Sequence, residues 1–328
     1  MPLKTPSFWY KQDCWQTKIL RPFALIYGYI SKKRMTKRPS YAANSKVICI
    51  GNLTAGGSGK TPTAIAIAKL VNNPSTVFLT RGYGGTIKTP EIVSAEHSAD
   101  ETGDEALLLS RIAPTLISRD RVEGAKLAEQ HHAKLIIMDD GLQNPKLFKD
   151  IRLCVIDGPT AFGNMECIPA GPLRQPLATG LIHADAFIII GDIDKKIEAL
   201  LPKAAPRFEA TIKAAPDILP DEYKLHQYVA FCGIAHPHKF INTLDEINAN
   251  VVKTRAFSDH HKYTVKEMSA LASFAERLDA RLITTEKDFV RIPEGPWVDK
   301  IDVLPVRLRF KDENQVMAFL ARHLAGEL

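Results

Sequence analysis

Short apolar runs alternate with amphipathic segments along most of this chain. Six of the runs have the length and the β-branched content of buried strands, and they occupy residues 47–50, 76–80, 115–118, 134–138, 151–157 and 186–190. Between them, apolar residues recur every three or four positions, as in helices, most clearly at residues 63–70 and 106–112. Buried strands that alternate with helices are typical of a mostly parallel sheet with helices on both faces. Residues 47–222 are therefore predicted to form an α/β domain of this kind.

A second α/β pattern follows a stretch that is rich in proline. Four prolines fall within residues 201–220, which we interpret as a connection between domains. Beyond it, the pattern predicts strands at residues 228–233, 251–256, 281–285 and 303–310, and helices at residues 264–278 and 312–324. Residues 223–328 are therefore predicted to form a smaller α/β domain that closes a cleft against the first.

The first 46 residues combine an apolar stripe with a strong basic charge. The stripe lies on one side of a predicted helix that begins just before Pro22, and it consists of Ile19, Phe23, Ile26, Tyr27 and Ile30. Residues 1–46 carry ten Lys and Arg residues and one Asp, whereas the rest of the chain carries 33 basic and 36 acidic residues. A basic amphipathic helix suits the surface of an anionic bilayer. We therefore expect residues 1–46 to form a membrane-association arm.

Three other interpretations of the arm stay open from its residues alone. The helix could pack on the protein's own body, or the arm could be an organelle transit peptide or a nucleic-acid-binding tail. We favour the membrane surface and expect no nucleic-acid partner. Because no apolar run approaches the roughly 18–20 residues of a spanning helix, the expected attachment is peripheral. The five cysteines are scattered without a C-x-x-C pair, which indicates buried free thiols in a reducing compartment.

A glycine-rich loop joins the first predicted strand to the first predicted helix. It comprises Thr54, Ala55, Gly56, Gly57, Ser58, Gly59, Lys60 and Thr61. Such a loop turns successive backbone N–H groups toward an anion, and the positive end of the following helix dipole adds to the attraction. We therefore predict a P-loop NTPase-like domain that binds ATP, with Lys60 at the β- and γ-phosphates and the Thr61 hydroxyl on Mg²⁺.

This loop departs from the usual phosphate-loop pattern at one position. Thr54 stands where the pattern G-x-x-x-x-G-K-[ST] has its first glycine, and the chain has Gly51 earlier instead. An ordinary glycine-rich turn is the alternative interpretation. Gly-Lys-Thr after a buried strand is a specific arrangement, however, so the nucleotide-binding interpretation is favoured.

Carboxylates at two places are candidates for the chemistry. Asp139 and Asp140 end an apolar strand downstream of the loop, where a carboxylate that organises Mg²⁺ is expected. A simple turn at the end of a strand is the alternative. Asp104 precedes the helix at residues 106–112, and its position alone favours a helix-capping role over that of a general base.

Two further loops follow predicted strands. The loop Arg-Gly-Tyr-Gly-Gly at residues 81–85 either lines a ligand crevice or forms a flexible turn. Asp259 and His260 join a strand to a helix in the second domain, and a local hydrogen bond between them is the simpler interpretation. The chain has no N-K-x-D pattern of guanine recognition, which argues against a Ras-type GTPase.

Together, these motifs resemble those of the tetraacyldisaccharide 4′-kinases, the lipid A 4′-kinases of Gram-negative bacteria. The resemblance rests on the loop at residues 51–62, and it extends through residues 81–85, 103–105, 139–143, 169–176, 257–263 and 285–288. These motifs follow one another in order over most of the chain. The displaced glycine of the loop and the arm at residues 22–30 are similar as well.

The resemblance implies a kinase that uses ATP and Mg²⁺. Its acceptor would be the 4′-hydroxyl of a tetraacylated glucosamine disaccharide 1-phosphate, which is a lipid A precursor embedded in the membrane. The enzyme would act at the cytoplasmic face of the inner membrane, as a peripheral protein drawn to its anionic surface. No obligate protein partner is inferred.

The resemblance also assigns roles to individual residues. It implies that Asp104 is the catalytic base, which replaces the capping role, and that His260 pairs with it, with Asp259 adjacent. It further implies that the groups that organise Mg²⁺ and phosphate are Asp139, Asp140 and Gln143. The family usually has His where this chain has Asn144, and Glu where it has Gln175. A neutral glutamine cannot supply the charge of a glutamate near the metal.

Two other functions compete with the kinase. A membrane-attached P-loop ATPase switch, which partitions or moves cargo, would explain the loop and the arm but not Asp104 with Asp259 and His260. A soluble nucleotide kinase would leave the arm unexplained. Deletion of residues 1–38 would then leave the activity untouched.

Overall fold

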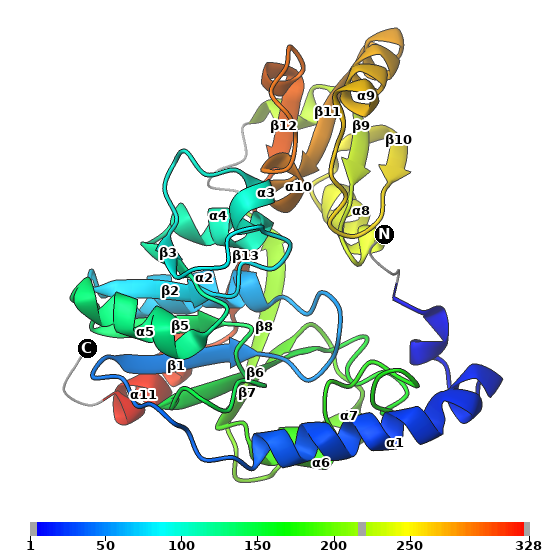
Figure 1. Cartoon of the computed structure of the whole chain (residues 1–328). Coiled ribbons are helices and arrows are strands. Elements are labelled where there is room, and N and C mark those ends of the chain that lie inside the picture. Colours follow the sequence, from blue (N-terminus) through cyan, green and yellow to red (C-terminus); the bar gives the residue numbers. More distant parts are fainter. Residues whose placement is uncertain (1–4, 216–220, 325–328) are drawn as a thin grey trace.

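The computed structural model describes residues 5–215 and 221–324 of the chain. It contains a nine-stranded sheet and a four-stranded sheet, and in Figure 1 the smaller sheet stands above the larger one. Strands and helices alternate along most of the chain. The predicted α/β class with a mostly parallel central sheet is confirmed.

The large sheet has the strand order β13-β8-β7-β6-β1-β5-β2-β4-β3. Its strands are β1 (Lys46–Gly51), β2 (Thr76–Thr80), β3 (Glu91–Ile92), β4 (Thr115–Ile117), β5 (Leu135–Asp139), β6 (Ile151–Asp157), β7 (Ala186–Ile190), β8 (Arg207–Ala214) and β13 (Val306–Phe310). Neighbouring strands are parallel except for the pairs β8–β13 and β3–β4 at the two edges. The central strands are buried on both faces, as their nearly continuous apolar sequences predict.

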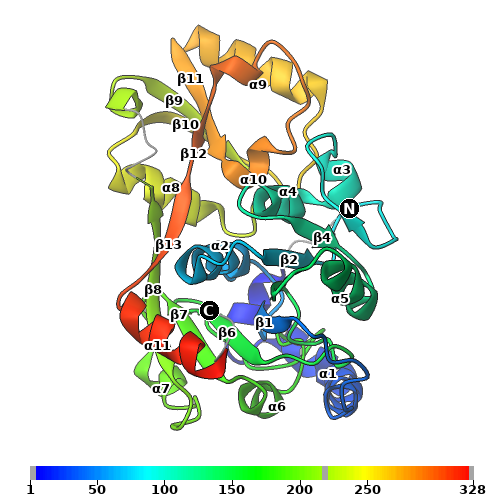
Figure 2. The same ribbon diagram turned by 90° about the vertical axis from the view of Figure 1, so that its left-hand side faces the viewer.

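Helices cover both faces of the large sheet. One face packs against α1 (Trp15–Met35), α5 (Arg121–Gln130), α6 (Leu177–Ile182) and α7 (Lys195–Glu198), and the other against α2 (Lys60–Val71), α4 (Asp104–Ser110) and α11 (Glu313–His323). Alternate side chains of β1 show the division, because Val47 packs in the first core and Ile48 in the second. Figure 2 shows α1 and α2 on opposite sides of the sheet. The short helix α3 (Ala99–Thr102) directly precedes α4.

The four-stranded sheet forms a smaller unit of the same class. Its parallel strands, in the order β10-β9-β11-β12, are β9 (Gln227–Cys232), β10 (Asn250–Ala256), β11 (Ala280–Thr285) and β12 (Ile301–Leu304). Its helices are α8 (Pro237–Glu246), α9 (Val265–Arg277) and α10 (Glu286–Phe289). Side chains of α8 and α9 pack in two separate cores, one on each face of the sheet. Three 3₁₀ turns complete the described elements, η1 (Ser7–Tyr10), η2 (Asp221–Lys224) and η3 (Val298–Lys300).

The chain passes between the two sheets twice, and the second passage corrects a prediction. Residues 303–310 are predicted as one strand, but they hold the end of β12 and the whole of β13, which belong to different sheets. Pro305 separates the two strands, because proline has no N–H with which to continue a ladder. Its carbonyl accepts a hydrogen bond from the N–H of Ala215 at 3.0 Å, so the two passages lie side by side.

The structure also differs from the predicted domain bounds. β8 lies within the proline-rich stretch that is predicted to be a connection, of which residues 216–220 lie outside the described residues. β13 and α11 return to the large sheet, where Phe310 and Phe319 share a core with Ile48 of β1. The pairing of β13 with β8 joins distant parts of the sequence. A local hydrophobic pattern predicts a strand but not the sheet that the strand joins.

Helix α1 begins earlier than predicted and contains Pro22 within it. It packs on the large unit through Ala24 and Gly28, and a Cβ at Gly28 would lie 3.3 Å from the sulfur of Cys167. The opposite side of the helix is apolar and 60–67% exposed at Trp15, Ile19, Phe23, Leu25, Ile26, Tyr29 and Ile30. The helix therefore does pack on the protein's own body, but through its small residues, whereas most of the predicted stripe stays exposed. Over the described ranges, we find no helix with the length and apolar character needed to span a bilayer.

Candidate active site

A cleft of about 1390 Å³ lies between the large sheet and the smaller unit. The loop before α2 lines it, as do residues that follow the carboxyl ends of β2 and β5, which is where parallel α/β sheets bind ligands. From the smaller unit, Asp259, His260 and Lys287 reach the same cleft. Arg34, at the basic end of α1, also contributes to its lining. The cleft therefore connects the predicted phosphate loop, the predicted catalytic residues and the end of the arm.

The phosphate loop has the backbone that its glycines predict. Gly56 and Gly59 have φ angles of 119° and 83°, in the region that favours glycine, and a Cβ at Gly59 would lie 2.6 Å from Ile190. Residues 55–61 line the cleft, whereas Thr54 forms a β-bridge with Leu173 instead. Helix α2 begins at Lys60, so its positive end faces the loop. The structure thus brings together the predicted nucleotide-binding residues, with Thr54 as the exception.

Asp139 and Thr61 form a buried pair beside the loop. The Thr61 hydroxyl donates a hydrogen bond to Oδ2 of Asp139 at 3.2 Å. Oδ1 of Asp139 is buried and has no hydrogen-bond partner among the described residues. Burial raises the pKa of Asp139 to about 7, the charge of Glu105 adds to the rise, and Lys60 opposes it. A buried carboxylate with one oxygen that lacks a hydrogen-bond partner is suited to bind a cation.

The donor set fits Mg²⁺ held together with a nucleotide. Mg²⁺ usually takes one or two carboxylates and completes its shell with phosphate oxygens and waters. Within the ranges that the structure describes, no cluster of three or more His, Cys, Asp or Glu side chains could hold a metal unaided. Thr61 and Asp139 would therefore hold the ion only with the help of the phosphates, as in other P-loop proteins.

Asp139 should destabilise the nucleotide-free protein at alkaline pH. Its folded-state pKa lies above the ordinary value, so the folded state holds an extra proton between about pH 4 and pH 7, and stability falls as the pH rises through this window. Asp139→Asn removes that proton equilibrium. Without Mg²⁺ and nucleotide, the variant should be more stable than the wild type at pH 8, by up to roughly 4 kcal/mol, and the gain should shrink at pH 5. Urea unfolding at the two pH values measures this, and a variant that is no more stable at pH 8 would contradict it.

Asp140 and Gln143 contact protein groups rather than the Asp139 pair. Nη1 of Arg174 donates to both carboxylate oxygens of Asp140, at 2.8 and 3.0 Å, and Nζ of Lys60 lies 3.8 Å from Oδ1. Burial raises the pKa of Asp140, but Lys60 and Arg174 outweigh it and lower the pKa to about 2. Gln143 donates from Nε2 to the carbonyl of Asn52 at 2.8 Å and lines the cleft. A direct role of these two residues at the metal stays a prediction.

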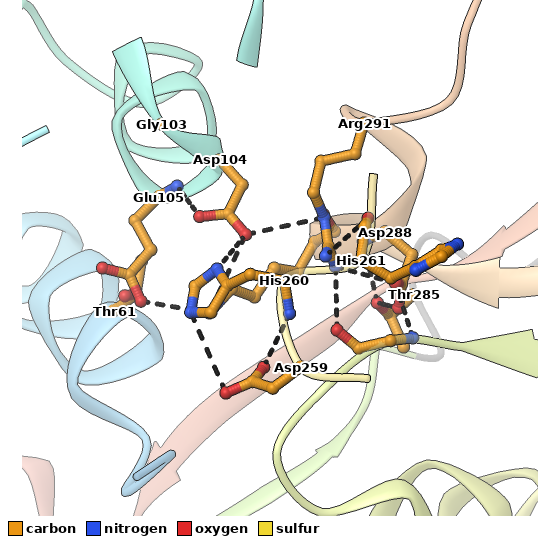
Figure 3. A network of polar contacts seen from close by, with 12 residues as sticks. Thr61, Gly103, Asp104, Glu105, Asp259, His260, His261, Thr285, Asp288 and Arg291 are labelled. Atoms are coloured by element: carbon orange, nitrogen blue, oxygen red, sulfur yellow. Dashed lines mark hydrogen bonds and ion pairs between the residues drawn. The ribbon is translucent and has the colours of Figure 1, made fainter. Parts of the chain in front are cut away.

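Asp104 and His260, which are 156 positions apart in the sequence, meet across the cleft (Figure 3). Oδ2 of Asp104 lies 2.9 Å from Nδ1 of His260. Because an ionised carboxylate can only accept, Nδ1 carries the proton in this pair. Nε2 of His260 then faces Asp259, with 3.9 Å to its Oδ2. The local bond predicted between Asp259 and His260 is also present, since the backbone N–H of His260 donates to Oδ1 of Asp259 at 3.1 Å.

Asp104 is held as a buried, ionised carboxylate. Only 2% of its side chain is exposed, and its Oδ1 accepts the backbone N–H of Glu105 at 2.9 Å. Burial raises the pKa of Asp104, but Lys287, His260 and Arg291 outweigh it and lower the pKa to about 2. Among the described residues that line the cleft, His260 and Glu105 appear but Asp104 does not. His260 is therefore the member of the pair that faces the cleft.

A buried arginine holds the loop that carries His260. The guanidinium of Arg291 donates to the carbonyls of His261 and Gly233, each at 3.1 Å, and to Asp288 at 2.7 Å. Its Nε lies 3.6 Å from Oδ2 of Asp104. Asp288 in turn accepts the N–H of Gly233 at 2.7 Å. These bonds fix the His260 loop, whose φ of 55° at His260 is unfavourable for a residue with a side chain.

Three basic residues at the site had no role assigned from the sequence. Lys287 lies 3.1 Å from Glu105 and 4.0 Å from Asp104, and it joins the smaller unit to α4. Arg174 pairs with Asp140, and Arg291 faces Asp104. Each of these contacts joins residues that are far apart in the chain. The sequence offered one weak signal for two of them: Arg174 lies in a predicted loop, and Lys287 lies at the end of a predicted strand.

The two departures from the family pattern have local contacts in this structure. Oδ1 of Asn144 accepts the backbone N–H groups of Lys146 and Leu147, which closes the turn after β5. Gln175 is buried, and its Oε1 has no hydrogen-bond partner among the described residues. Beside it in the sequence, Arg174 supplies the charge that reaches Asp140.

Comparison with known proteins gives the same family throughout. The family model described as tetraacyldisaccharide-1-P 4′-kinase matches residues 16–325. The tetraacyldisaccharide 4′-kinase of Methylobacterium radiotolerans is 43% identical, with 99% of each chain covered. That of Bradyrhizobium diazoefficiens is 38% identical, with 98% of this chain and 97% of the relative covered.

The fold has a counterpart among solved structures. The structure of LpxK from Aquifex aeolicus in complex with ATP superimposes with a TM-score of 0.76, covering 94% of this chain and 99% of that one. At 24% identity, this likeness supports the fold. The family match over nearly the whole chain does not favour the ATPase switch. The chain belongs to the tetraacyldisaccharide-1-P 4′-kinase family.

Proposed function

We propose that this protein transfers the γ-phosphate of ATP to the 4′-hydroxyl of a tetraacylated glucosamine disaccharide 1-phosphate, a step of lipid A synthesis. One observation carries the proposal within this family. The phosphate loop with Lys60 and the side chain of His260, which is paired with Asp104, line one cleft, so a donor phosphate and an acceptor hydroxyl can meet there. Phosphoryl transfer depends mainly on such positioning and on neutralised charge.

ATP is held by the loop at residues 55–61. The backbone N–H groups and the start of α2 bind its phosphates, and Lys60 neutralises charge on the β- and γ-phosphates. Thr61 and Asp139 hold Mg²⁺, which supplies positive charge against the phosphate oxygens. Asp140 keeps Lys60 and Arg174 in place through its two ion pairs.

The acceptor hydroxyl loses its proton to the pair formed by Asp104 and His260. A sugar hydroxyl is a weak nucleophile until a base within hydrogen-bond reach takes its proton. His260 lines the cleft, its Nε2 is the ring nitrogen that is not bonded to Asp104, and the ionised Asp104 holds the ring and stabilises the charge that the ring gains. Asp259 lies on the Nε2 side, with its Oδ2 at 3.9 Å. The two residues therefore act as one base.

The smaller unit shields the reaction from water. A Cβ at Gly57 of the loop would lie 3.3 Å from the Cβ of Ala235, so the segment before α8 covers the phosphate site. Lys239 of α8 pairs with Asp157 at the end of β6, and Lys287 pairs with Glu105 on the other side. We propose that residues 223–305 form the closing domain and that β13 and α11 belong to the kinase domain. Exclusion of water favours the sugar over hydrolysis.

The arm brings the enzyme to its insoluble acceptor. The exposed apolar side of α1 suits the interfacial region of a bilayer, and the basic residues that follow it suit anionic headgroups. Arg34, near the end of this helix, contributes to the lining of the cleft. We propose that the protein attaches peripherally to the cytoplasmic face of the inner membrane.

Polar substitutions on α1 should weaken binding to vesicles. The variant replaces four residues of α1 that are 60–61% exposed with serine: Ile19, Phe23, Ile26 and Ile30. Its affinity for anionic vesicles should fall at least tenfold, which corresponds to a loss of binding free energy of about 1.4 kcal/mol or more. ATP binding should be unchanged. Vesicle sedimentation measures the loss. The matched control is the double variant Leu225→Ser with Val265→Ser, which changes two exposed apolar residues of the smaller unit. Equal binding of the α1 variant and the control would exclude α1 as the anchor.

Nucleotide turnover with and without the acceptor separates a kinase from an ATPase switch. We expect slow ATP hydrolysis by the protein alone and strong, Mg²⁺-dependent transfer of label from γ-labelled ATP when the disaccharide is added in detergent micelles. A switch would hydrolyse ATP or self-associate with nucleotide alone. Fast hydrolysis that the disaccharide does not change would overturn the kinase proposal.

A further inference from the structure

Tyr83 is an exposed aromatic residue beside the catalytic pair. It lies in the loop between β2 and β3, and 65% of its surface is exposed. Its ring centroid is 5.4 Å from that of His260, with an angle of 58° between the two planes. Tyr83 lines the main cleft, and with His260 and Lys262 it also lines a second hollow.

The backbone around Tyr83 is packed onto the residues that precede Asp104. A Cβ added at Gly85 would lie 2.4 Å from the carbonyl oxygen of Glu101. A Cβ added at Gly103 would lie 2.3 Å from the carbonyl oxygen of Tyr83. Gly103 has a φ of 84°, and Figure 3 shows it immediately before Asp104 at the start of α4. Only glycine permits these approaches. The backbone of Tyr83 is therefore fixed relative to the catalytic carboxylate.

Beside this fixed backbone, the side chain itself has open surroundings. A Cβ at Gly84, the next residue, would meet nothing within 4 Å among the described residues. A large aromatic ring left mostly in water does not gain from burial in the fold. The loop thus holds an aromatic face rigidly, close to the catalytic histidine, with space next to it. From the sequence, the loop at residues 81–85 could either line a ligand crevice or form a flexible turn. Its tight packing contradicts the flexible turn.

We propose that Tyr83 is the platform on which the sugar ring that carries the acceptor hydroxyl rests. A pyranose ring has a face of C–H groups that packs on an aromatic ring, while its hydroxyls point outward at the edge. A sugar placed on Tyr83 would direct an edge hydroxyl toward His260. Because small displacements of a reacting group cost large factors in rate, a fixed platform serves the transfer. This inference rests on the proposed function and names a substrate contact of that site.

Kinetics with varied acceptor test the platform. With the acylated disaccharide in micelles, Tyr83→Ala should lower kcat/KM for the disaccharide by about 30-fold or more, mainly through a higher KM. Tyr83→Phe and Tyr83→Trp keep an aromatic face and should stay within about threefold of the wild type. ATP affinity and acceptor-independent ATP hydrolysis should not change in any of them. Phe148→Ala, an aromatic residue that is 47% exposed and lies outside the lining of the cleft, is the matched control.

The outcomes separate this inference from the proposed function. Wild-type kcat/KM in Tyr83→Ala, or a loss in Tyr83→Phe as large as that in Tyr83→Ala, would overturn the platform while transfer by the wild type still stands. A lower kcat and slower hydrolysis with an unchanged acceptor KM would also overturn it, because Tyr83 would then act only by supporting His260. Failure of the wild type to phosphorylate the disaccharide would overturn the proposed function and, with it, the platform.

Discussion

Asp104→Ala should reduce phosphoryl transfer by about 10³-fold or more while ATP still binds with nearly unchanged affinity. The loss has two causes: His260 loses the carboxylate that orients its ring at 2.9 Å, and it loses the negative charge that stabilises the ring when it accepts the proton. ATP binding should survive because Asp104 is not among the described residues that line the cleft, whereas residues 55–61 are. Single-turnover transfer measures the first effect, and calorimetric titration with ATP measures the second.

Two further variants make this result interpretable. Asp104→Ala removes one of the carboxylates that face Lys287 and Arg291 and leaves a cavity at a buried position, which threatens folding, so Asp104→Asn should be measured beside it because it keeps the shape. Asp100→Ala removes a carboxylate from the same acidic segment whose ion pair with Lys262 is exposed, and it should retain activity. Near-normal transfer by folded Asp104→Asn would remove Asp104 from the mechanism.

Lys60→Ala should weaken both nucleotide binding and transfer. Lys60 is 9% exposed, begins α2 and points to the site where the phosphates are expected, with Asp140 at 3.8 Å. We expect the Kd for ATP to rise by about 100-fold and transfer at saturating ATP to fall by about 10³-fold, because the charge is needed in the bound state and more in the transition state. Fluorescence titration with a labelled nucleotide and initial rates measure the two effects.

The contrast between the two positions is itself informative. Asp104 should affect only the chemical step, whereas Lys60 should affect both steps. Lys126→Ala, in an exposed pair with Glu123 on α5, is the control for removal of a lysine. Tight ATP binding by Lys60→Ala would show that the loop does not hold the triphosphate through this residue.

Local patterns were sufficient for most of the large sheet. β2, β6 and β7 begin and end where the apolar runs predict, and α9 begins after Thr264, whose side chain caps it. The phosphate loop was equally visible, because its function depends on a few adjacent residues. Thr54 is the exception, because it forms a β-bridge with Leu173 and does not line the cleft.

Contacts between distant segments were beyond local patterns. β13 pairs with β8 almost one hundred positions away, and Pro305 was the one sign that residues 303–310 are two strands. The pair of Asp104 with His260 was expected only through the family resemblance, because the spacing alone favoured a cap for Asp104. No residue near Arg291 in the sequence indicates that its guanidinium joins three carbonyls and two carboxylates.

The arm shows how the structure adds to a correct pattern. The hydrophobic pattern predicted the stripe from Ile19 to Ile30 but not the side on which the helix packs. Small residues, Ala24 and Gly28, allow close packing on the large unit, so the large apolar side chains stay outside. The exposed apolar side of α1 is wider than the stripe, because Leu25 and Tyr29 extend it.

The position of the new phosphate on the sugar tests the central claim most directly. The enzyme is incubated with ATP, Mg²⁺ and the tetraacylated disaccharide 1-phosphate in micelles, and the product is examined by phosphorus–proton correlation NMR and mass spectrometry. We predict one added phosphate, coupled to the proton at the 4′ carbon, and none when Asp104 is replaced by asparagine. Release of inorganic phosphate with an unmodified disaccharide, or a phosphate at another hydroxyl, would contradict the account.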